Sequence, residues 1–274
     1  MSDTLIPSNP SDVMVIRDVT PNVVTLSVPF LRFNRIPIGG RGTIVRLSSG
    51  ALAVFSPVAL TPEVKAKLVE LGNELRYIIA PDIEHHIFVS DWKAAFPSAT
   101  LICVDGLPEK RAAQNDPKIG KDAFDVVFKP DTKRTTSISA EFDQDFEYEY
   151  VDAHANKELV FFYKPDRVLI EADLLFNLPA TEQYSRVPEK DRPNPGFLAR
   201  QFMSLQSTQG EVKGLKRLTW YAISRGNRAG FNDSVKRIAA WDFKIIVPCH
   251  GDVIEEGAKE TFEKVFDWHL NGRK

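Results

Sequence analysis

The sequence lacks the features of a membrane protein and of a nucleic-acid-binding protein. No stretch of its 274 residues approaches the roughly 20 consecutive apolar residues that a membrane helix needs. Lysine and arginine number 35 against 37 aspartate and glutamate residues, and no dense basic block is present. Without a broad positive field, a protein has little attraction for nucleic acids or acidic lipid surfaces. We therefore expect no nucleic acid and no membrane as partner.

Cysteine is also scarce, and the first residues carry no export signal. The two cysteines, Cys103 and Cys249, stand in apolar, strand-like runs, which predicts buried and reduced thiols. Residues 1–14 are polar and lack the basic and apolar regions of a secretory signal. These two absences predict a cytoplasmic protein.

What is present is the composition of an ordinary globular protein. The chain has 43% hydrophobic and 26% charged residues, which is typical of a domain with a sizeable core. Its length fits one large α/β domain, so we expect a single domain over residues 1–274. A proline-rich stretch, 178–197, predicts a long surface loop, and loops of this length often act as lids over binding sites.

Hydrophobic patterning predicts strands and helices in both halves of the chain. Strands are predicted at 23–28, 43–48, 52–56, 76–80, 100–104, 146–153, 159–176 (as a hairpin) and 244–248. Helices are predicted at 61–72, 88–96, 196–206, 211–223 and 232–241. The glycine-rich stretch 38–43 is predicted to be a flexible hairpin turn, because it precedes a strand rather than a helix. This order suggests a layered pair of sheets with helices on the outside.

Histidine is rare, yet four of the five histidines follow the ends of predicted strands. These are His85, His86, His154 and His250, and Asp173 stands at the end of a further strand. Any one of them alone would be explained most simply as a surface or core residue. Because neighbouring strands end at one edge of a sheet, however, we expect these side chains to gather there. Imidazole and carboxylate groups together suit Zn, Fe or Mn.

The motifs around these residues resemble those of the metallo-β-lactamase-fold superfamily. VLIEADLLFN, the hairpin carrying DAH before it, and IIVPCHGD look like the family's later metal motifs, with His154, Asp173 and His250 at the matching positions. The stretch IIAPDIEHHIF aligns with the family's HxHxDH motif and places His86 on its final histidine. The resemblance implies an α/β fold, a four-layer αββα sandwich, in a divergent branch of unknown function.

The chain departs from the HxHxDH motif at three positions. Pro81 and Ile83 replace the first two histidines, and His85 replaces the aspartate, so one of the family's two metal sites is lost. The ligand set that the resemblance implies for the other site is His85, His86, Asp173 and His250, with His154 as a fifth ligand or left free. For two consecutive histidines to reach one ion, the backbone after the strand must be irregular, and Pro81 is consistent with this. We expect one divalent metal ion, zinc first and iron or manganese as alternatives.

A metal ion with an open coordination position lowers the pKa of water from about 15.7 toward about 7, which permits hydrolysis without a protein nucleophile. The first hypothesis is therefore a metal-dependent hydrolase with a mononuclear site, acting on an ester, thioester, lactone or amide bond of a small-molecule substrate. Asp82, Glu84 or an unligated His154 are the candidate catalytic bases. In the alternative structural interpretation, Glu84 is a solvated loop residue and Asp82 stabilises a turn.

Two other hypotheses stay open. One is an iron- or manganese-dependent oxidoreductase on the same scaffold, and the other is a non-catalytic metal-binding or ligand-binding descendant of the fold. Arginines in and after the predicted loop are candidates for binding an anionic substrate, although a solvated surface position is the favoured explanation for each: Arg186, Arg192, Arg200, Arg225 and Arg228. The sequence does not determine the oligomeric state, and a homo-oligomer is left open.

Overall fold

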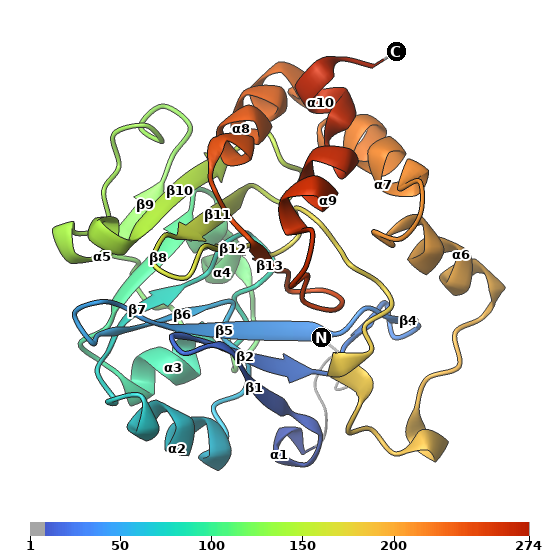
Figure 1. Cartoon of the computed structure of the whole chain (residues 1–274). Helices are drawn as coiled ribbons and strands as arrows, with labels where there is room; N and C mark the ends of the chain where they lie inside the picture. The colour runs from blue at the N-terminus through green and yellow to red at the C-terminus, as the bar shows by residue number, and fades with distance from the viewer. Residues whose placement is uncertain (1–8, 274) are drawn as a thin grey trace.

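The computed structural model describes residues 9–273, so the first eight residues of the predicted polar N-terminus lie outside the described part. Two large β-sheets face each other, and helices cover the outer face of each sheet (Figure 1). The predicted four-layer αββα sandwich is confirmed. No helix within residues 9–273 is both long enough and apolar enough to cross a membrane.

The larger sheet contains seven strands within the described residues and has the order β1-β2-β5-β6-β7-β8-β9. These strands are β1 Val15–Thr20, β2 Val23–Val28, β5 Gly40–Arg46, β6 Leu52–Phe55, β7 Leu75–Ile79, β8 Thr100–Val104 and β9 Val126–Phe128. Pairing is antiparallel from β1 to β6 and parallel from β6 to β9. A short hairpin, β3 Leu31–Arg32 and β4 Ile36–Pro37, projects between β2 and β5.

Three helices of this half connect the parallel strands: α2 Pro62–Glu70, α3 Val89–Ala95 and α4 Leu107–Ala113. The short helix α1 Pro10–Val13 precedes β1. The hydroxyl of Thr61 accepts a hydrogen bond from the backbone N–H of Val64 at 3.3 Å and caps α2, as the sequence predicted. Such a cap contributes about 1 kcal/mol to stability, and Val64 and Leu68 then bury the inner face of the helix.

The smaller sheet has the order β10-β11-β12-β13 and carries the second half of the chain. Its strands are β10 Phe146–Val151, β11 Glu158–Tyr163, β12 Val168–Ile170 and β13 Ile245–Val247. The helices of this half are α5 Ala140–Asp145, α6 Phe197–Leu205, α7 Lys213–Leu218, α8 Arg228–Ala240, α9 Ala258–Val265 and α10 Asp267–Asn271. The last two strands, β12 and β13, run parallel, so both end at the same edge of the sheet.

Strand β11 shows how the two cores form. All six of its side chains are buried, because the facing sheet covers one side of the strand and helices cover the other. Phe161 points into the core between the sheets and lies edge-on to Phe55, with ring centroids 4.9 Å apart. Its neighbour Phe162 points to the outer core and stacks on Trp241 at 5.9 Å. The alternation of a strand thus fills both layers of packing.

The structure corrects several element predictions. Most of the glycine-rich stretch predicted as a turn is strand β5, which the antiparallel pairing with β2 extends to Gly40. The hairpin strand predicted to reach 176 ends at Ile170, and α8 begins at Arg228, because Asn227 caps it, rather than at 232. In the predicted surface loop 178–197, two short 3₁₀ turns form, and the first packs inside the protein. The predicted buried free cysteines are confirmed.

Candidate metal centre

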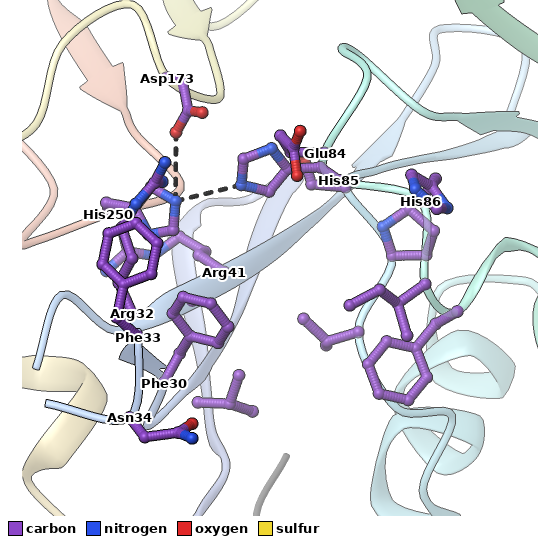
Figure 2. Close-up of a pocket in the computed structure, with 17 residues that line it drawn as sticks. Phe30, Arg32, Phe33, Asn34, Arg41, Glu84, His85, His86, Asp173 and His250 are labelled. Atoms are coloured by element: carbon purple, nitrogen blue, oxygen red, sulfur yellow. Dashed lines mark hydrogen bonds and ion pairs between the residues drawn. The ribbon is translucent and has the colours of Figure 1, made fainter. Parts of the chain in front are cut away.

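Three predicted site residues, His85, Asp173 and His250, meet at one edge of the two sheets. One potential ligand atom from each lies within 4.8 Å of the other two. The Nε2 atoms of His85 and His250 are 3.1 Å apart, and His250 Nε2 lies 3.2 Å from Asp173 Oδ1 (Figure 2). The three residues follow β7, β12 and β13 respectively. The exits of strands far apart in the sequence therefore converge, as predicted.

His250 is held in place by backbone carbonyls and by a buried arginine. Its Nδ1–H donates to the carbonyl of Gly39 at 2.6 Å, which leaves the lone pair of Nε2 directed at the cluster. Arg41 is buried and donates to the carbonyls of Pro248 and Gly251 on either side of the histidine, at 2.5 and 2.7 Å. The strand position of Arg41 thus fixes the loop that carries His250.

His85 is oriented in the same way by a carboxylate. Its Nδ1 lies 2.9 and 3.0 Å from the two oxygens of Asp82, which is fully buried. Asp82 also accepts hydrogen bonds from the backbone N–H groups of Glu84 and His85, each at 2.8 Å, and so shapes the turn. Burial alone would lower the pKa of His85, but the negative charges of Asp82 and Asp173 outweigh it and raise this pKa to about 10.

The arrangement of His85, His250 and Asp173 favours a cation between their side chains. With both Nδ1 atoms used as donors, two Nε2 lone pairs face each other at 3.1 Å, which requires a proton or a metal ion between them. Asp173 Oδ1 is buried without a well-formed hydrogen bond among the described residues. Burial would raise the pKa of Asp173, but the charge of His85 and the nearby ring of His250, whose Nε2 lies 3.2 Å from Oδ1, lower it and keep the carboxylate ionised. Two imidazoles and a carboxylate fit a divalent metal ion.

The structure does not bring His86 to this cluster, contrary to the sequence prediction. In Figure 2, His86 lies across the pocket from His250. Its Nδ1 is 3.3 Å from Nη1 of Arg111, and the same arginine donates to its carbonyl at 2.8 Å. Burial and the charge of Arg111 lower the pKa of His86 to about 4. The side chains of His85 and His86 therefore leave the turn in different directions. The carboxylate of Asp82 holds the ring of His85, whereas Arg111 holds the backbone carbonyl of His86.

His154, predicted as a ligand or a base, also lies outside the cluster. Its side chain is completely buried, and its Nδ1 accepts a hydrogen bond from the backbone N–H of Asn156 at 3.1 Å. Asn156 in turn donates to Oδ2 of Asp173, so His154 is linked to the cluster indirectly. Burial lowers the pKa of His154, and its Nε2 has no hydrogen-bond partner among residues 9–273.

A buried glutamate, which the sequence analysis missed, supports Asp173 from behind. Glu158 is fully buried and accepts hydrogen bonds from the backbone N–H groups of Ala172 and Asp173 at 2.8 and 3.0 Å. Burial raises the pKa of Glu158 well above its usual value, and the charges of Asp82 and Asp173 add to this. Glu158 therefore fixes the backbone of the ligand turn. Its one sequence signal is a carboxylate at the start of an otherwise apolar strand.

The cluster opens onto a cavity of about 470 Å³. Of the three predicted catalytic bases, only Glu84 lines this cavity, where it forms an ion pair with Lys110 at 2.8 Å. The cavity is also lined by Arg32 and Phe33 of the hairpin β3–β4 and by Phe30 just before it, none of which was among the predicted site residues. A signal was available, because VPFLRFN places apolar and aromatic residues between two strands where a polar turn would be expected.

The arginines suggested by the sequence do not line this cavity. Arg186, Arg192 and Arg200 donate to the carbonyls of Met14, Val187 and Pro195, and so hold loop backbone in place. The cavity is lined instead by Arg32 and Arg41, which come from the first half of the chain.

Comparison with known proteins identifies a family by sequence and a fold by structure. The family model for a domain of unknown function, DUF4336, matches residues 33–224. No curated protein matches the chain by sequence. A metal-soaked flavodiiron core from Synechocystis is similar in structure, with a TM-score of 0.60, 12% identity, and coverage of 93% of this chain and 60% of that one.

Two further solved structures show the same likeness. A metallo-β-lactamase from Pontibacter korlensis has a TM-score of 0.54 at 12% identity and covers 94% of this chain and 99% of its own. A flavo di-iron protein mutant from Thermotoga maritima has a TM-score of 0.55 at 12% identity, with coverage of 93% and 62%. The chain therefore spans about three fifths of these flavodiiron chains. At this identity, the likeness shows a common fold, which is the metallo-β-lactamase fold.

Proposed function

The chain belongs to the DUF4336 family of domains of unknown function, and from the geometry of its site we propose that it is a metal-dependent hydrolase acting on a small molecule. The observation that carries the proposal is the meeting of His85, Asp173 and His250 at the wall of a cavity of about 470 Å³. Three protein ligands leave coordination positions open, which is characteristic of catalytic rather than structural metal sites.

In this proposal, different residues bind the metal, orient its ligands and accept a proton. His85, Asp173 and His250 would hold one divalent ion, which when bound would polarise a carbonyl oxygen and lower the pKa of water toward about 7. Asp82 orients His85, and the carbonyl of Gly39 orients His250. Glu84 faces the cavity, so its carboxylate is placed to accept a proton from an attacking water.

The scissile bond is proposed to be an ester, thioester, lactone or amide, because each offers a carbonyl that a Lewis acid can polarise. The cavity also lies within the roughly 300–1,000 Å³ typical of small-molecule sites. Zinc is the first expectation for the ion, since it suits mixed histidine and carboxylate ligands and hydrolytic chemistry.

One observation favours a second candidate, an iron- or manganese-dependent oxidoreductase. Two histidines and one carboxylate are also the ligand set of many non-haem iron oxygenases. The fold is shared with proteins named as flavodiiron and di-iron proteins. Metal identity separates the two candidates, because a hydrolase restored by zinc alone has no need of redox chemistry.

The test is elemental analysis of the purified protein beside two variants, His250→Ala and His86→Ala. We expect about one metal ion per chain in the wild type and in His86→Ala, and none in His250→Ala. Hydrolysis of 4-nitrophenyl acetate should disappear after chelation and return with zinc. Full hydrolysis by metal-free protein would contradict the proposal, and restoration of an oxygen-consuming activity by iron alone would favour the second candidate.

A further inference from the structure

The charged residues that line the cavity differ in whether their charge is already neutralised. Arg41 is fully engaged, since it binds Ser27, two backbone carbonyls and Glu182. Glu84 is paired with Lys110 at 2.8 Å. Arg32 differs from both, because its guanidinium makes no hydrogen bond or ion pair with any of residues 9–273.

Arg32 is nevertheless held in a defined place. It belongs to β3, and its guanidinium lies over the ring of Phe33, 5.3 Å from the ring centroid. A cation on an aromatic face keeps its N–H groups directed outward, and five such donors suit a carboxylate, sulfonate or phosphate. The cavity therefore contains one positioned cation with unused donors.

The rest of the cavity wall is predominantly apolar. Val28 and Phe30 contribute one part of it, and Val58, Ile87 and Phe88 contribute another. Phe33, at the tip of the hairpin, leaves 74% of its surface exposed although it borders the cavity. Figure 2 shows Phe30 and Phe33 on the side of His250, with His86 on the opposite side. When a ligand covers apolar surface of this kind, the removal of that surface from water favours binding.

We infer that the ligand of this cavity is amphiphilic, with an apolar chain or ring against the aromatic and aliphatic wall and an anionic group on Arg32. This inference rests on the proposed function, in which the same cavity holds the substrate. It identifies the substrate class as an apolar carbonyl compound that carries a carboxylate, sulfonate or phosphate at a distance from the scissile bond.

The experiment measures binding of butane-, hexane- and octanesulfonate, with 1-octanol as the uncharged probe, to the purified protein by isothermal titration calorimetry. Sulfonates are chosen because they are weak metal ligands. Affinity should rise about three- to fourfold for each added methylene while the chain remains inside the cavity. Octanesulfonate should also bind about tenfold more tightly than 1-octanol.

Variants separate Arg32 from general charge effects. Arg32→Met should lower the affinity for octanesulfonate about tenfold and leave that for 1-octanol unchanged. Arg32→Lys should recover part of the loss. The matched control is Arg35→Met, which removes an exposed arginine of the same hairpin that does not line the cavity, and it should bind as the wild type does.

Two results would overturn the inference. Equal binding of octanesulfonate by wild type and Arg32→Met would show that Arg32 does not hold the anion. Loss of binding after chelation, with no effect of Arg32→Met, would place the anion at the metal ligands instead. Metal content is measured in the same samples, so failure of the proposed hydrolase appears as absence of metal, whereas failure of this inference appears as metal-loaded protein without Arg32-dependent binding.

Discussion

The cluster at the cavity and the buried surroundings of His154 contain the same kinds of residue, yet only the first is arranged to bind a metal. In the cluster, each imidazole donates its Nδ1–H to an oxygen and directs Nε2 at a shared point. His154 uses its Nδ1 as an acceptor, and its Nε2 meets no partner among the described residues. A ligand histidine thus needs an orienting acceptor on one nitrogen and an accessible common point for the other.

The segment that replaces the family's first two histidines explains the difference. The carbonyl of Pro81 accepts a hydrogen bond from the N–H of Leu159 at 2.7 Å, and the N–H of Ile83 donates to Asn156 at 3.2 Å. Ile83 also packs against the core between the sheets. Backbone pairing and apolar packing therefore occupy this region, and His154 stacks near Phe231 rather than facing a second site.

The first prediction compares the metal cluster with the surroundings of His154, and it concerns metal affinity. Asp173→Ala removes the carboxylate of the cluster and should lower metal affinity by more than about 100-fold. Loss of a residue that only orients a metal ligand costs up to about 100-fold, and loss of a ligand itself should cost more. His154→Ala should leave metal affinity nearly unchanged. Competition with a chromophoric chelator measures both, and circular dichroism verifies that each variant is folded. An equal loss in the two variants would show that His154 is a ligand.

The second prediction concerns the backbone that orients His250. Gly39 has φ of +69°, and a Cβ there would overlap the side chain of Gln183. Gly39→Ala should therefore lower the free energy of unfolding by about 2–4 kcal/mol. Gly50 is the control, because it also has a positive φ, +90°, but no atom lies within 4 Å of its would-be Cβ.

For Gly50→Ala we expect a loss of about 1 kcal/mol, from backbone conformation alone. Urea unfolding of both variants gives the comparison. Similar losses in the two would mean that the contact with Gln183 contributes nothing to the loop.

The third prediction separates the orientation of His85 from that of His86. Asp82→Asn keeps the shape of the side chain but removes the charge behind His85, so metal affinity should fall about 10- to 100-fold. Asp122→Asn is the matched change on the other side, since Asp122 pairs with the arginine that binds His86. Metal affinity should not respond to it, and a comparable fall would contradict the separation of the two histidines.

The last prediction concerns pH, where the expected change is the smallest for a single step of one unit. In metal-free protein the pKa of His85 is raised from 6.5 to about 10, so a metal ion must displace its proton, and affinity should fall about tenfold for each unit of pH lowered below that value. The raised pKa also stabilises the metal-free fold fully below pH 6.5, and this contribution is lost as pH rises through about 10.

Thermal unfolding with and without metal between pH 6.5 and about 9 tests this prediction. The stabilisation by metal should widen as pH rises. A constant difference across the range would show that His85 does not exchange its proton for the metal.

The layers of this protein and most of its site could be predicted from the amino-acid sequence. Local patterns were sufficient for this, because a continuous apolar strand such as β11 and a capped helix such as α2 are recognised from residues close together in the sequence. The positions of His85, Asp173 and His250 after predicted strands were sufficient to propose that they meet.

Which histidines converge, and what surrounds them, depends on contacts between segments that are distant in the sequence. His85 and His86 are adjacent in sequence, and their directions are set by Asp82 on one side and by Arg111, 25 residues away, on the other. Arg41 reaches loop carbonyls more than 200 residues distant, and Arg32 reaches the cavity through a hairpin that pairs only two residues on each side. Hydrogen bonds and packing between such distant segments have no local pattern, because their partners are brought together only when the sheets close on each other.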